Sequence, residues 1–62
     1  MRVVLWRPKN GASLESVANK QGWPVLDLAG GAAAYDPRYG KVYVESAAAK
    51  AVAAAIDWAS RL

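Results

Sequence analysis

The chain carries few side chains that could do chemistry. Its 62 residues include no histidine and no cysteine, which removes imidazole bases, disulfides and the commonest zinc ligands. The five carboxylates are scattered without the spacing of a calcium-binding loop: Glu15, Asp27, Asp36, Glu45 and Asp57. We therefore predict no catalytic residue, no metal site and no cofactor, and a protein that is not an enzyme.

Two short motifs could suggest chemistry, but each has a plainer structural interpretation. Ser13 could act as a nucleophile only beside a base, and none is visible, so we interpret it as the N-cap of a helix. Gly30-Gly31 is not followed by the lysine of a phosphate-binding loop, so we interpret it as a helix-ending break.

The aromatic residues are the strongest candidates for binding, with three tryptophans and three tyrosines in so short a chain. Such rings stack on sugars or bases and anchor protein interfaces, but they also fill small cores. Trp6 and Trp58 fit core positions, Trp23 fits either role, and Tyr39 lies in a turn where it would be exposed. We name Trp23, Tyr39 and Trp58 as candidate partner contacts.

Charge and hydropathy exclude several classes of partner. The net charge is +3, and the eight basic residues are spread along the chain rather than gathered on one element, so we do not expect a nucleic-acid partner. No apolar run reaches the ~20 residues of a membrane span, and no segment resembles a secretion signal. We expect the protein to be cytoplasmic when it is made, or part of a virion.

The length predicts a single domain over residues 1–62. Domains this small usually gain stability from disulfides, a metal or a partner. With the first two absent, we expect a protein partner or self-association.

The first half of the chain shows a strand, a helix and an ambiguous segment. Residues 2–7 form a β-rich apolar run, and residues 8–13 read as a loop. A helix is predicted over 14–21, from the Ser13 cap to a left-handed Gly22, with Gly11 also expected at positive φ. We predict a second short helix over 24–29, with a strand over Val25–Leu28 as the alternative.

The second half begins with a turn. Asp36-Pro37 has turn chemistry, and residues 41–45 alternate so that Val42 and Val44 share one face. This strand should lie beside the first strand, and Tyr35 could begin a hairpin with it.

An alanine-rich amphipathic helix is predicted from Ala47 to about Arg61, capped by Ser46. The 3.6-residue period assigns the inward-facing stripe to five residues: Val52, Ala55, Ile56, Ala59 and Leu62.

The order of these elements resembles the lysin-motif (LysM) family over residues 3–45. The family's Gly-Asp-Thr-Leu turn is similar to Gly11-Ala12-Ser13-Leu14, and its Ile-Ala pair to Val17-Ala18. Gly22, Leu28 and the turn at Asp36-Pro37, followed by the strand from Gly40 to Val44, match later positions of its pattern. The resemblance implies an α+β fold with a LysM-like βααβ core over 1–45, built on a two-stranded antiparallel sheet, and the C-terminal helix over 46–62 is additional.

The resemblance also implies a function. LysM modules bind polymers of N-acetylglucosamine, such as peptidoglycan, in a shallow groove between two loops. Carried over by position, that groove would contain Gly11, Ala12, Ser13, Leu28 and Ala29. Small LysM-like tail proteins of phages, such as the tail protein X group, imply a different role as subunits of the tail hub or baseplate.

Two alternatives remain open. In a winged-helix DNA-binding protein of the excisionase type, residues 14–21 would be the first helix, 25–29 the recognition helix and 36–40 the wing. That recognition helix would offer only Asp27, which repels phosphates. In a small phage protein that inhibits a host protein, the aromatic residues would make the contact. We predict a non-catalytic binding or assembly module.

Overall fold

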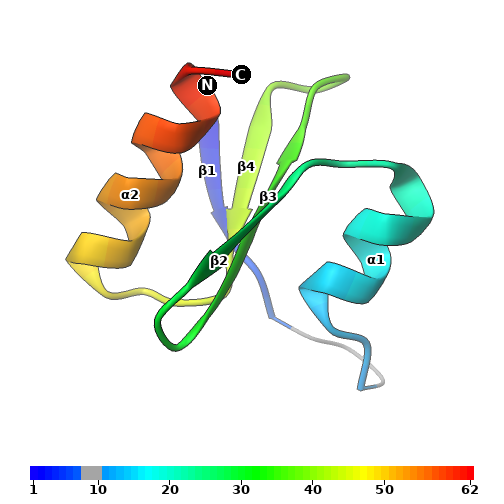
Figure 1. The fold of residues 1–62 in the computed structure, drawn as a ribbon, viewed down its shortest axis with the longest axis horizontal. Coiled ribbons are helices and arrows are strands. Elements are labelled where there is room, and N and C mark those ends of the chain that lie inside the picture. The colour runs from blue at the N-terminus through cyan, green and yellow to red at the C-terminus, as the bar shows by residue number, and fades with distance from the viewer. Residues whose placement is uncertain (8–10) are drawn as a thin grey trace.

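The structure is a four-stranded sheet covered by one helix on each face (Figure 1). This computed structural model describes residues 1–7 and 11–62. The elements in chain order are β1 (Arg2–Leu5), α1 (Leu14–Gln21), β2 (Val25–Leu28), β3 (Gly31–Asp36), β4 (Lys41–Val44) and α2 (Ala49–Ser60). The sheet order is β1-β4-β3-β2, with β1 parallel to β4 and the other neighbours antiparallel.

The predicted LysM-like βααβ core is wrong. The sheet has four strands rather than two, it is mixed rather than antiparallel, and the segment expected as a second helix is β2. The broad α+β class is correct, because the described residues form both helices and β-strands.

Residues 25–28 form a strand because their side chains alternate between two cores. Leu26 and Leu28 pack against the cluster under α2, whereas Val25 packs against the cluster under α1. A helix over residues 24–29, as predicted, could not point alternate side chains into both cores. Gly30, at φ +86°, sits in the two-residue turn that joins β2 to β3, so it turns a hairpin rather than ending a helix.

The first and last strands are neighbours, as predicted, but they run parallel. The chain passes through α1 and the β2–β3 hairpin before it returns as β4, and a long crossover of this kind is what parallel pairing needs. Val42 and Val44 share one buried face, which confirms the predicted alternation.

Helix α1 has the predicted ends. The Ser13 hydroxyl accepts a hydrogen bond from the Ser16 N–H at 3.1 Å, and Gly22 closes the helix at φ +75°. Gly11 has the expected positive φ of +74°. The loop predicted over residues 8–13 falls in part on residues 8–10, which lie outside the described residues.

Helix α2 begins later than predicted, at Ala49. The Ser46 hydroxyl accepts a hydrogen bond from the Ala48 N–H at 3.2 Å, in a turn before the helix, and Ala48 is the N-cap. Upstream of this turn, Glu45 ties the end of β4 to β3, because its carboxylate accepts a hydrogen bond from the Ala32 N–H at 2.7 Å.

The buried stripe of α2 consists of alanines, namely Ala51, Ala55 and Ala59. The inward face predicted for this helix is therefore only partly right. Ile56 and Leu62 were assigned to it, but they are 38% and 61% exposed.

The two faces of the sheet carry separate cores. Under α2, Ala55 and Ala59 pack with Val42, Val44 and other residues of the sheet. Under α1, the buried residues are Leu14, Ala18 and Ala34, joined by half-buried aromatic rings. Neighbouring residues of β3, Ala33 and Ala34, serve one core each, so both helices approach a central strand of small side chains.

Candidate binding surface

The five residues assigned to a ligand groove do not come together. Gly11, Ala12 and Ser13 lead into α1, whose Leu14 lies in the core on one face of the sheet. Leu28 packs on the opposite face, beneath α2, and Ala29 follows it in the hairpin turn. The groove implied by the LysM resemblance is therefore not formed by these positions.

Leu28 and Ala29 instead line a shallow pocket of about 230 Å³ at the start of α2. The remaining lining comes from the helix and the residue before it: Ala48, Lys50, Ala51 and Ala54. The pocket is smaller than typical small-molecule sites of roughly 300–1,000 Å³. Its one charged residue, Lys50, gives it little capacity to orient a polar ligand.

Trp23, a predicted partner contact, belongs to an aromatic stack on the α1 face. Its ring lies parallel to that of Tyr43, with centroids 5.2 Å apart. Trp6 meets the same tyrosine edge-on at 5.7 Å. These contacts join the residue after β1, strand β4 and the segment after α1, which gives Trp23 a structural role.

The other two predicted contacts differ in exposure. Tyr39 is 68% exposed in the turn between β3 and β4, with the Arg38 guanidinium carbon 5.9 Å and the Lys41 ammonium nitrogen 5.6 Å from its ring centroid. Asp36 shapes this turn, since its carboxylate accepts a hydrogen bond from the Arg38 N–H at 3.0 Å. Trp58 is half-buried and packs against the α2-face core.

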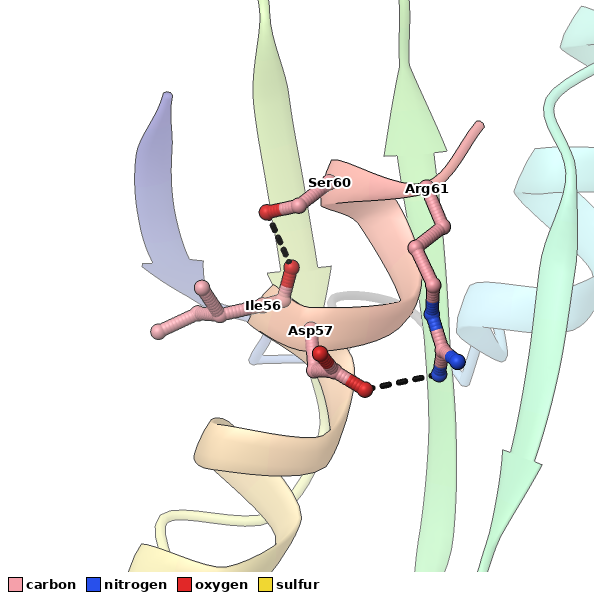
Figure 2. Close-up of polar contacts among 4 residues, drawn as sticks. All are labelled: Ile56, Asp57, Ser60 and Arg61. Carbon is pink, nitrogen blue, oxygen red and sulfur yellow. Dashed lines mark hydrogen bonds and ion pairs between the residues drawn. The ribbon is translucent and has the colours of Figure 1, made fainter.

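A surface that the sequence did not reveal lies where β1 meets the side of α2. Val3 and Leu5 pair with Val42 and Val44, so their side chains lie on the α2 face of the sheet, yet they are 41% and 39% exposed. Figure 2 shows Ile56 projecting sideways from α2 toward β1, away from the exposed Asp57–Arg61 ion pair. We call Val3, Leu5, Ile56 and the free edge of β1 the β1–α2 surface.

The free edge of β1 offers backbone hydrogen-bonding groups. The Arg2 N–H donates to the Gly40 carbonyl at 2.9 Å and the Trp6 N–H donates to the Val44 carbonyl at 2.8 Å. Even-numbered residues of β1 thus bond to β4, and because successive N–H groups of a strand point to opposite edges, those of Val3 and Leu5 point outward. Apolar side chains and unpaired backbone groups coincide there.

No protein-family model, curated protein or solved structure matches this chain.

Other kinds of site are not visible in the part of the chain that the structure describes. Residues 1–7 and 11–62 contain no group of three or more acidic, histidine or cysteine side chains that could hold a metal ion. Neither helix within those ranges combines the length and hydropathy needed to cross a membrane.

The β1–α2 surface was missed because the apolar run Val3–Trp6 reads equally well as a strand buried on both faces. The pattern of apolar residues in this run does not indicate whether the strand lies at the centre or at the edge of a sheet. Ile56 was missed because alanines, rather than the larger residues, form the centre of the buried stripe of α2.

Proposed function

We propose that this protein is a non-catalytic assembly module that binds another polypeptide through the β1–α2 surface. The observation that carries the proposal is the gathering of Val3, Leu5 and Ile56 at a strand edge. Single exposed apolar residues are normal, but an apolar group beside an open strand edge is typical of a protein-binding site.

The backbone of β1 favours a polypeptide over other ligands. An added strand satisfies a row of outward N–H and C=O groups at regular spacing, while pockets or flat apolar patches receive alternate side chains. On β1 the exposed side chains of Val3 and Leu5 alternate in this manner, and Ile56 extends the apolar area onto α2.

Two roles predicted from sequence, a phage-tail subunit and an inhibitor of a host protein, are versions of this proposal and stay predictions. Peptidoglycan binding was tied to a groove whose residues lie on opposite faces of the sheet, and DNA binding to a recognition helix where β2 is found. Those two predictions stay untested and receive no support from the geometry.

Site-specific photo-crosslinking tests the proposal. A photoreactive phenylalanine analogue at position 56 should capture a polypeptide in cells of the source organism, and adding Val3→Lys should abolish the product. The same analogue at position 54, an exposed position on the other side of α2, should capture much less. Equal products from both positions, or none from position 56, would contradict the proposal.

A further inference from the structure

We propose that the occupant of the β1–α2 surface is a second copy of this chain, paired through antiparallel β1 strands about a two-fold axis at Val4. This inference rests on the proposed function and names the partner. In such a pair two four-stranded sheets become one sheet of eight strands, with both α2 helices on one face.

The hydrogen-bonding pattern of β1 is complementary to itself in this register. Val3 and Leu5 carry the outward N–H and C=O groups, since the even-numbered residues bond to β4. Placing Val3 opposite Leu5 of the second copy lets the two residues exchange both of their backbone hydrogen bonds. The two-fold axis repeats this pair, so four outward donors and acceptors on each strand are satisfied together.

The side chains are also compatible. On the α2 face, Val3 and Leu5 of both copies form one apolar strip, and the exposed Ile56 from each α2 lies at its side. On the α1 face, Arg2 lies opposite Trp6 of the second copy, where a guanidinium can rest against an indole ring. No like charges oppose each other along Arg2–Trp6, a condition that antiparallel pairing of identical strands often fails.

The opposite edge of the sheet is a poorer candidate for self-pairing. β2 carries an exposed carboxylate, Asp27, within its four residues. Pairing two such strands about their middle would bring these two carboxylates close together, and charged side chains on an edge strand discourage edge-to-edge association.

Sedimentation velocity from about 1 µM to about 1 mM tests the proposal on the wild-type chain. A reversible shift from monomer to dimer is expected, and Val3→Lys should weaken the dimer at least about tenfold, because each dimer contains the change twice. Ala29→Lys, which places the same charge on an exposed residue in the β2–β3 turn, beside the opposite edge of the sheet, should leave the dimer unchanged. Circular dichroism of both variants verifies that the monomer is folded.

Disulfide trapping tests the register. Val4 lies on the axis in a non-hydrogen-bonded pair, where the Cα atoms of facing residues are about 4.5 Å apart. In this cysteine-free chain Val4→Cys should give a disulfide-linked dimer under mild oxidation, and Val3→Cys, which faces Leu5 instead of itself, should react far more slowly.

The outcomes separate the two proposals. A wild-type chain that stays monomeric, or a Val3→Cys variant that crosslinks as fast as Val4→Cys, would overturn the paired-strand dimer. If position 56 then still captured a different polypeptide, the proposed function would stand. If it captured nothing, both would fail.

Discussion

The two faces of the sheet are closed in different ways. On the α1 face, large side chains meet: Trp23 stacks on Tyr43, Trp6 meets Tyr43 edge-on, and all three belong to the cluster that contains the fully buried Leu14. On the α2 face, the helix contributes alanines to the centre of the contact, and larger apolar residues remain outside at one edge. The α1-face core therefore consists of a few large side chains, whereas the α2-face core consists of alanines from the helix packed on buried valines of the sheet, with apolar residues left exposed at one edge.

This difference suggests that the two faces contribute differently to stability and to association. Aromatic contacts on the α1 face bury much area in a small domain, which has little stability to spare. The alanine stripe brings α2 close to the sheet but buries less area per residue, and it leaves Ile56 free to contact a partner. Both cores should then contribute to stability, whereas association should depend on the exposed apolar edge of the α2 face.

The largest expected effect is on the α1 face. Leu14→Ala should lower the free energy of unfolding by roughly 2–5 kcal/mol, because it opens a cavity beneath a fully buried side chain. Ile56→Ala, on the partly open side of α2, should cost less than about 1 kcal/mol in the monomer. Urea unfolding followed by tryptophan fluorescence at low concentration measures both. Equal losses of unfolding free energy in the two variants would contradict the difference between the buried Leu14 and the exposed Ile56.

The close approach of α2 to the sheet can be tested by placing a larger side chain between them. Ala55→Leu places a large side chain where the helix contacts Val42 and Val44, and should destabilise the fold by roughly 1–3 kcal/mol. Ala53→Leu on the exposed side of the same helix is the matched control and should change stability little. If thermal melts show that Ala55→Leu is neutral, α2 does not pack as tightly as the alanine stripe indicates.

The cap of α1 should contribute less. Ser13→Ala removes the acceptor of the Ser16 N–H and should cost roughly 0.5–2 kcal/mol. Ser16→Ala retains the backbone donor and should cost almost nothing. Chemical denaturation of the two variants gives the comparison, and a larger loss for Ser16→Ala would argue against the cap.

The exposed ion pair on α2 should matter least. Arg61 and Asp57 approach to 2.6 Å, but both side chains are largely exposed (Figure 2). Asp57→Ala should therefore cost only about 0.3–0.5 kcal/mol at low salt. Thermal melts in low and high salt should show this small difference disappearing as the salt concentration rises.

Local signals in the sequence predicted local structure well. Ser13 and Gly22 set the ends of α1 through one hydrogen bond and one left-handed residue, and neither depends on distant contacts. The Asp36 turn and the alternation of Val42 and Val44 were predictable for the same reason.

Features that depend on distant contacts were not predictable. Val25–Leu28 is too short for periodicity to separate a helix from a strand, and its pairing with β3 decided the outcome. The position of β1 at the sheet edge follows from the pairing of strands far apart in sequence. Since the candidate site is that edge, the sequence could not reveal it, and the family resemblance directed attention to positions on opposite faces.

Residue-resolved hydrogen exchange at low and high protein concentration tests most directly whether β1 is a binding edge for a second copy. The account predicts that the amides of Val3 and Leu5 exchange freely in the dilute sample and become protected in the concentrated one, while the Trp6 amide, bonded to Val44, is protected in both. Unchanged exchange at Val3 and Leu5 across the whole concentration range would contradict it.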